Sequence, residues 1–176
     1  MNSAAVTDAG PGDQTARQRT FLELLNAHLG IVHRVSRAYA AGSTADQQDL
    51  FQEIVYQLWR SYPTYRGASS PVTWVYRVAL NTAITSVRKR ARRPAHVPLE
   101  DSEPVASTPP GERPEVAQLY RAIQQLSDVE RALVMCYLDD LSYSRIAEVL
   151  GLSETNVGVR LTRVKAKLQR LVAGSE

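Results

Sequence analysis

Apolar residues recur every three or four positions through most of this chain, which is the period of an amphipathic α-helix. In the first half, the pattern predicts three helices, over about 21–42, 45–61 and 71–91. Ser70 followed by Pro71 suits the start of the third helix, because a proline in the first turn has no N–H that needs a partner. No segment shows the strict alternation of a β-strand, so we expect an all-α fold.

The composition changes at residues 94–113, where proline, serine and acidic residues replace the apolar ones. Such a segment has little to bury, so it predicts a flexible linker. Helical spacing resumes at Pro114, and Ser127 with Glu130 forms a capping-box pattern before the next apolar run. We therefore expect two small helical domains joined by a flexible linker. The predicted parts are a disordered tail at 1–17, a first domain at 18–93, the linker at 94–113 and a second domain at 114–176.

Residues 145–168, RIAEVLGLSETNVGVRLTRVKAKL, have the pattern of a helix-turn-helix. Ala147 is small enough for two helices to cross closely, and Gly151 tolerates the positive φ of a tight turn. Ser153 then caps a helix whose apolar residues recur at spacings of three and four. The residues that face away from this apolar stripe are Thr155, Asn156, Val159, Arg160 and Arg163.

These outward residues suit duplex DNA. A recognition helix presents its N-terminal part to base edges in the major groove, where arginine pairs with guanine, asparagine with adenine, and valine meets a thymine methyl. Glu154 could accept a hydrogen bond from a cytosine amine or simply favour the helix dipole. Lys165, Lys167 and Arg170 are better placed for phosphates. The alternative interpretation is a solvated cationic face.

A second cationic run, SVRKRARR at 86–93, closes the third predicted helix, and Tyr62, Tyr65 and Arg66 lie in the loop before that helix. Aromatic rings beside a cationic track suit single-stranded nucleic acid, because bases stack on rings while phosphates follow charge. The cations could equally complement the negative end of a helix. We expect Trp74 to belong to the core.

Asp46, Asp49 and Glu53 recur at spacings of three and four, so they share one face of the second predicted helix. Three interpretations remain open: a solvated acidic face, a site for a hard metal ion, or a docking surface for a basic partner. The histidines have no matching ligand spacing, and we expect neither a metal nor a cofactor.

Composition narrows the class of protein. The chain has 176 residues, a formal net charge of +3 and a single cysteine, Cys136, which excludes an internal disulfide framework. No apolar run approaches the ~18 residues of a membrane span, and the N-terminus lacks the apolar stretch of a signal peptide. We expect a cytoplasmic protein without membrane insertion.

Taken together, these motifs resemble the bacterial RNA polymerase sigma factors of the extracytoplasmic-function class, within the sigma-70 family. DLFQEIVYQLWRSYPTYRG at 49–67 and TWVYRVALNTAITSVRKRARR at 73–93 resemble two successive parts of that family's region 2. ERALVMCYLDDLSYSRIAEVLGLSETNVGVRLTRVKAKL at 130–168 resembles region 4. The resemblance covers about residues 18–93 and 114–172.

The resemblance implies a transcription initiation factor and not an enzyme. Its implied partners are core RNA polymerase, promoter DNA read as duplex at the −35 element and melted at the −10 element, and an anti-sigma factor. A stand-alone helix-turn-helix regulator is the main alternative, and a metal-dependent nucleic-acid enzyme using the acidic face is a third. One departure is Pro71–Val72, where family members often have an aromatic residue before the Thr-Trp pair; Tyr65 could substitute.

The resemblance also assigns the site residues. Those implied to bind core polymerase are Asp49, Leu50, Phe51, Gln52 and Glu53. Those implied for the −10 element are Tyr65, Arg66, Ser69, Ser70, Arg77, Asn81, Arg88, Lys89 and Arg90, with Asn81 and the loop from Arg66 holding a flipped base. Those implied for the −35 element are Glu154, Thr155, Asn156, Val159, Arg160, Arg163, Lys165 and Lys167.

Overall fold

The computed structural model describes residues 11–40, 43–92 and 113–174, and the regular structure within those ranges is helical throughout. The all-α prediction is therefore confirmed. The helices are α1 (Pro11–Tyr39), α2 (Thr44–Ser61), the short 3-10 helix η1 (Tyr62–Thr64), α3 (Pro71–Arg92), α4 (Pro114–Gln124), α5 (Asp128–Leu138), α6 (Tyr143–Leu150) and α7 (Glu154–Ala173).

A search of the described helices finds none that is both long enough and apolar enough to cross a membrane.

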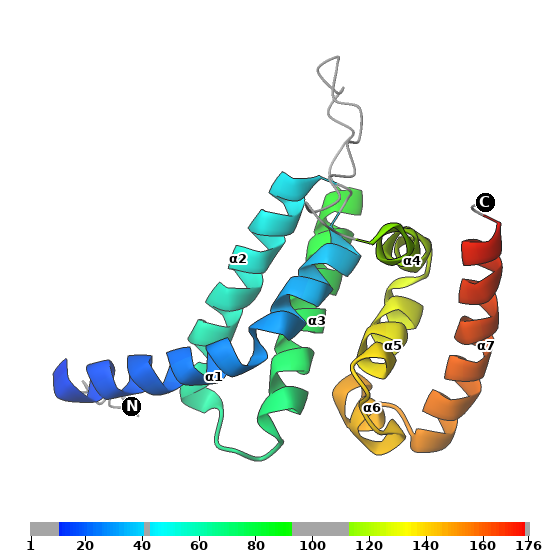
Figure 1. Ribbon diagram of the computed structural model, residues 1–176. Helices are drawn as coiled ribbons and strands as arrows, with labels where there is room; N and C mark the ends of the chain where they lie inside the picture. Colours follow the sequence, from blue (N-terminus) through cyan, green and yellow to red (C-terminus); the bar gives the residue numbers. More distant parts are fainter. Residues whose placement is uncertain (1–10, 41–42, 93–112, 175–176) are drawn as a thin grey trace.

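The first module consists of α1, α2 and α3, which pack side by side around buried aliphatic residues such as Val35, Ile54 and Ala79 (Figure 1). Its N-terminal boundary differs from the sequence prediction, because α1 begins at Pro11 and residues 11–17 are helical instead of belonging to the tail. A proline is favourable in the first turn of a helix, and the Arg17 guanidinium lies 5.6 Å from the Trp59 ring centroid, which ties this part of α1 to α2. Residues 1–10 and nearly all of the predicted linker lie outside the described residues.

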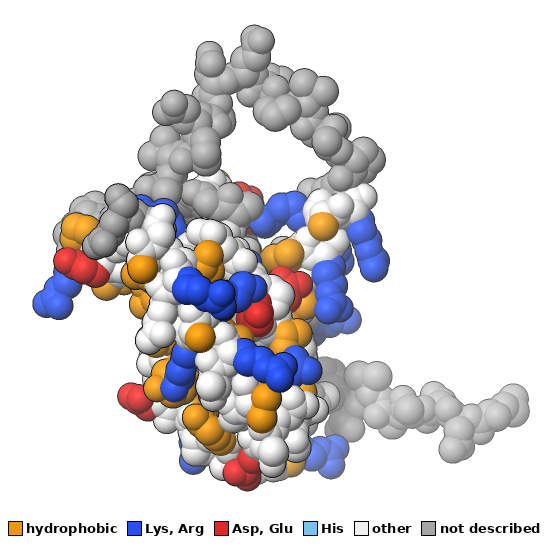
Figure 2. Space-filling model, turned by 90° about the vertical axis from the view of Figure 1, so that its right-hand side faces the viewer, with side chains coloured by type: hydrophobic (Ala, Val, Ile, Leu, Met, Phe, Trp, Pro, Cys, Tyr) orange, Lys and Arg blue, Asp and Glu red, His pale blue; other side chains and the backbone are white. Residues whose placement is uncertain are grey.

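The second module consists of α4 to α7; its predicted caps at Ser127 and Ser153 are confirmed, and Ser142 provides a further one. The hydroxyl groups of Ser127, Ser142 and Ser153 each accept a hydrogen bond from the backbone N–H three residues later, so each satisfies one free donor of a helix start. Gly151 ends α6 with φ 66°, a left-handed conformation that glycine adopts without strain. Helix α7 lies on the outer side of this module, the side that Figure 2 shows.

The two modules pack against each other, which the expectation of two domains on a flexible linker did not include. Helix α6 lies against α3, and α4 and α5 lie against α1. Buried residues of both modules form one continuous hydrophobic cluster, in which Tyr76 of α3 is 0% exposed. Helical periodicity identifies a buried face on each helix but not the partner that covers it, so this packing could not be read from the pattern.

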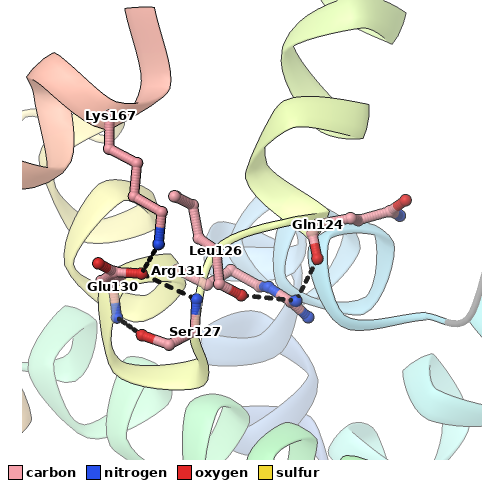
Figure 3. Close-up of polar contacts among 6 residues, drawn as sticks. All are labelled: Gln124, Leu126, Ser127, Glu130, Arg131 and Lys167. Carbon is pink, nitrogen blue, oxygen red and sulfur yellow. Dashed lines mark hydrogen bonds and ion pairs between the residues drawn. The ribbon is translucent and has the colours of Figure 1, made fainter. Parts of the chain in front are cut away.

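A polar network fixes the turn between α4 and α5 and attaches it to α7 (Figure 3). Arg131 donates to the carbonyls of Gln124 and Leu126, at 2.7 and 3.1 Å, and thereby satisfies the end of α4. The Glu130 carboxylate accepts from the Ser127 backbone N–H at 2.9 Å and pairs with the Lys167 ammonium at 2.8 Å. These bonds lower the pKa of Glu130, the pair with Lys167 being the main cause.

The network predicts that Glu130→Ala lowers the free energy of unfolding by about 1 kcal/mol at about pH 7, the usual loss for a helix cap. Glu130→Gln should retain most of the capping, because glutamine also completes a capping box. The lowered pKa means that the ionised carboxylate stabilises the fold above its unfolded pKa. That contribution is lost as the pH falls through the folded pKa.

Urea denaturation of the two variants and the parent at about pH 7 and about pH 4 measures both effects. The difference in the free energy of unfolding between the parent and Glu130→Gln should be smaller at about pH 4 than at about pH 7. An Ala variant as stable as the parent at neutral pH would contradict the role of the network.

Candidate nucleic-acid interface

Helices α6 and α7 form the helix-turn-helix that the sequence predicts. Leu152 N–H donates to the Ala147 carbonyl at 3.0 Å, which closes the turn around Gly151. Val157, Leu161 and Val164 are buried and hold α7 against α5 and α6. Since these residues define the inner side of α7, its opposite side is available to solvent along the first three turns.

Every side chain predicted to read bases on α7 is exposed. The Nε atom of Arg160 donates to the amide oxygen of Asn156 at 2.9 Å, so the two side chains are held together one turn apart. Val159 is 48% exposed, so its methyl groups are accessible for the contact with a thymine methyl that the sequence predicts. Figure 2 views the molecule from this side and shows several Lys and Arg side chains interspersed with apolar ones. The exposed set is Glu154, Thr155, Asn156, Val159, Arg160 and Arg163.

The two lysines predicted for the −35 element already have neighbours within the protein. Lys167 lies on the same row of α7 as Arg160 and Arg163, and its ammonium pairs with Glu130. The Lys165 ammonium lies 3.7 Å from the centroid of the Tyr137 ring, a cation–π contact with the end of α5. Both lysines therefore attach α7 to α5 in addition to placing positive charge beside the recognition face.

A groove of about 610 Å³ runs between α2 and α3 in the first module. One wall carries the carboxylates of Asp49 and Glu53, and the other carries Asn81 of α3. Asp46 and Arg90 face each other at its end with 3.8 Å between their charged atoms. The groove therefore has an acidic wall and a polar-to-basic wall. Its full lining is Asp46, Asp49, Leu50, Glu53, Gln57, Asn81, Thr82, Thr85, Ser86, Lys89 and Arg90.

The five residues of α2 that are predicted to bind polymerase differ in their exposure to solvent. Asp49, Gln52 and Glu53 are exposed. Phe51 is half-buried and stacks on His33 with 4.5 Å between ring centroids. Leu50 is 3% exposed and belongs to the core, so it supports α2 from inside and has almost no surface to offer a partner.

The loop between α2 and α3 is held by an aromatic stack. The Tyr65 ring lies 4.7 Å from that of Trp74 at an angle of 26°, and its hydroxyl donates to the Ser69 carbonyl at 2.8 Å. The Ser70 hydroxyl accepts from the Thr73 backbone N–H at 3.2 Å, as expected for the start of α3. Arg66 is exposed at the loop's tip. The loop thus presents one ring, one cation and several backbone polar groups in a fixed arrangement.

The remaining predicted −10 residues lie along α3 and are not all in one place. Asn81 lines the groove with the acidic residues of α2, about ten Å along the helix from Trp74. Arg88 and Lys89 are exposed in the last turns of α3. The Arg77 guanidinium instead donates to the Glu148 carbonyl of α6, from Nε at 3.1 Å and from a terminal nitrogen at 2.7 Å.

Sequence reasoning missed the small polar residues of the groove, Thr82, Thr85 and Ser86. They recur beside Asn81 and Lys89 at helical spacing, which is the signal that could have found them. The acidic residues of α2 were considered as metal ligands, and in the described part of the chain no three His, Cys, Asp or Glu side chains are grouped to hold a metal ion. All three of these acidic residues, Asp46, Asp49 and Glu53, share the groove with the cations Lys89 and Arg90 instead.

Comparison with known proteins identifies the family. Residues 24–93 match the family described as Sigma-70 region 2, and residues 117–168 match Sigma-70, region 4. An RNA polymerase sigma-H factor from Pseudomonas aeruginosa is 30% identical, over 90% of this chain and 87% of its own. An ECF RNA polymerase sigma factor, SigG, from Mycobacterium tuberculosis is also 30% identical over 92% of this chain, which spans about half (49%) of that relative's length.

The solved structures agree on the fold. The sigma factor RpoE, crystallised with the anti-sigma factor NepR from Bartonella quintana, superposes with a TM-score of 0.64 at 17% identity, over 89% of this chain and 96% of its own. Both sigma-70 regions thus occur in order within one chain, on the helical scaffold of a solved sigma factor. The chain therefore belongs to the extracytoplasmic-function group of the sigma-70 family of RNA polymerase sigma factors.

Proposed function

We propose that this chain is a transcription initiation factor that binds core RNA polymerase, recognises the −10 and −35 promoter elements and assists promoter opening in the cytoplasm. The observation that carries the proposal is the presence, in one chain, of two complementary surfaces. These are the exposed recognition face of α7 and the charged groove with its aromatic loop between α2 and α3. Polymerisation chemistry belongs to the polymerase, so the factor needs no catalytic group of its own.

Helix α7 reads the −35 element as duplex. The hydrogen bond between Asn156 and Arg160 restricts both side chains before DNA arrives, which lowers the entropy lost when they pair with base edges. Arg163 lies one turn further along the same exposed row. The row suits a major groove, where arginine pairs bidentately with guanine and asparagine with adenine.

The first module provides the polymerase contact and the −10 contact. Exposed carboxylates at Asp49 and Glu53 suit a cationic partner helix. The loop with Tyr65 and Arg66 offers a ring for stacking and a cation for a phosphate, the combination that melted DNA needs. Asn81 supplies an amide for the edge of a flipped base, although it stands in the groove and not in the loop.

Regulation by an anti-sigma factor is part of the proposal. The supporting observation is the likeness in fold to a sigma factor crystallised with an anti-sigma factor. Such a partner would cover the same charged groove or recognition face that polymerase and DNA need.

The function is tested by transcription in vitro from fragmented bacterial genomic DNA, using sigma-free core polymerase with and without this protein. We expect new transcripts whose upstream regions share a two-element motif. If active core yields no new transcript and does not bind the protein, while the protein alone retards specific DNA, the chain is a stand-alone regulator instead.

If α7 reads the −35 element as duplex DNA, Arg160→Ala should weaken transcription from a promoter that depends on this element. The loss should amount to about 1–3 kcal/mol, the usual range for one bidentate base contact, and should vary with the base at one position. Arg121→Ala is the matched control, because it removes the same charge from an exposed site on α4 of the same module. If Arg160→Ala and Arg121→Ala transcribe equally well from every base variant of the −35 element, Arg160 does not read a base.

Docking through α2 predicts that Asp49→Lys or Glu53→Lys weakens binding to core polymerase. Both residues are exposed, so the fold should remain intact while an unfavourable charge faces the cationic partner. Glu23→Lys is the matched control, because it reverses the same charge at an exposed site on α1, away from the groove. Fluorescence anisotropy with labelled protein measures the affinity, and the effect should diminish at high salt. Unchanged affinity in both groove variants would rule out this docking surface.

A further inference from the structure

Two of the exposed residues of α7 that are predicted to read bases are bound to each other. The Nε–H group of Arg160 donates to the amide oxygen of Asn156 at 2.9 Å. The two residues stand four positions apart, where successive turns of a helix bring side chains together, and both side chains are exposed. The amide of Asn156 therefore has a partner within the protein before any DNA binds.

The chemistry of this pair fixes which atom of the amide faces the arginine. Every N–H group of a guanidinium is a donor and none of its atoms accepts, so the amide has to offer its oxygen and not its nitrogen. A bidentate contact with adenine needs the same oxygen to accept from the N6 amine while the amide nitrogen donates to N7. To read adenine, the oxygen of Asn156 would have to leave Arg160 or be shared between two donors.

The same bond determines how Arg160 can approach a base. A guanidinium presents two pairs of parallel N–H bonds, one from Nε with a terminal nitrogen and one from the two terminal nitrogens at the tip. Because Nε donates to Asn156, the pair at the tip stays available for DNA. Two donors at the tip match the two acceptors of guanine, O6 and N7, in the major groove. The bond thus leaves Arg160 suited to an end-on contact with guanine.

The backbone beneath the pair is well anchored, so the freedom that remains lies in the side chains. The Asn156 N–H donates to the hydroxyl of Ser153, the cap of α7, at 3.2 Å. The residues that directly follow the two members of the pair are buried in the core: these are Val157 and Leu161, 0% and 1% exposed. The long side chain of Arg160 has much conformational freedom to lose on binding, and its bond to Asn156 removes part of that freedom in advance.

Arg163, the other arginine of this face, has no comparable support from its own helix. A helical side chain meets those three and four positions away. Around Arg163 none of these side chains can accept a hydrogen bond, since they belong to Val159, Arg160, Ala166 and Lys167. Around Arg160 the only acceptor at these spacings is Asn156. The two arginines therefore differ in one respect that a variant can remove.

We infer that Asn156 is a positioning residue, whose amide oxygen holds Arg160 in the orientation that reads a guanine of the −35 element. The inference rests on the proposed function and deepens it, because it assigns the two residues one base pair instead of two. Arg160 carries the base specificity, and Asn156 acts through Arg160 instead of reading an adenine of its own.

Removal of the amide should therefore change the preference at one base pair only. In Asn156→Ala the Arg160 side chain is released and has to be ordered by the DNA itself. We expect the preference for guanine at the base pair of Arg160 to fall about two- to tenfold, the effect of immobilising one flexible side chain at an interface. The preference at the base pair of Arg163 should stay at the parent's value.

The experiment uses the full chain assembled with core polymerase, and promoters in which each base pair of the −35 element is replaced in turn by the other three. Transcription in vitro is measured for the parent, Asn156→Ala, Arg160→Ala and the double variant. The comparison of the parent with Arg160→Ala identifies the base pair that Arg160 reads. Once Arg160 is absent, the loss of Asn156 should cause no further change in preference, so the two effects should be strongly non-additive.

A conservative variant separates positioning from base reading. Asn156→Asp keeps an oxygen that can accept from Arg160 but loses the N–H that adenine N7 requires. We expect Asn156→Asp to retain the parent's preference for guanine, while the added negative charge lowers transcription from every promoter by a similar factor. Unchanged helical circular dichroism of all variants shows that the recognition helix remains folded.

Three outcomes would overturn the inference while leaving the proposed function intact. The first is the loss in Asn156→Ala of a preference for adenine at a separate base pair. The second is additivity of the effects of Asn156→Ala and Arg160→Ala, and the third is an Arg160→Ala variant with the parent's preference at every base pair. If the parent itself directs no promoter-dependent transcription, the proposed function fails instead.

Discussion

The arrangement of the two modules depends on the ion pair and hydrogen bond that the largely buried carboxylate of Asp139 makes with Arg34 and Tyr76. A charged group with so little exposure is tolerated only when it is fully paired, and here Arg34 and Tyr76 pair with it from two different helices. Their positions fix how the helix-turn-helix lies against α1 and α3. The surfaces that we propose to bind DNA and polymerase are therefore positioned by a contact outside both of them.

Within each module, the functional surfaces follow from the way apolar residues are buried. Val157, Leu161 and Val164 pack one side of α7 into the core, so its opposite side exposes the residues that we propose to read bases. Leu50 does the same for α2, since its burial turns the carboxylates beside it towards the groove. The exposed residues thus owe their direction to buried neighbours three or four positions away.

Local features were predictable from the sequence, and distant pairings were not. The caps at Ser127 and Ser153 and the left-handed Gly151 depend on residues within one turn, so short motifs specify them. Asp139, by contrast, stands in a Leu-Asp-Asp turn that has the composition of a solvated loop, and its partners lie 105 and 63 positions away. Nothing in local spacing identifies such a pair.

Polar contacts accompany the shared apolar cluster at the interface between the two modules. An interface of apolar residues alone would favour permanent association, whereas polar groups regain hydrogen bonds to water when the modules part. The Arg77 guanidinium illustrates this exchange: it donates to the Glu148 carbonyl of α6, and a phosphate would accept from the same N–H groups. A residue that we propose to bind DNA thus also joins the two modules, so a phosphate that binds Arg77 competes with the Glu148 carbonyl for the same N–H groups.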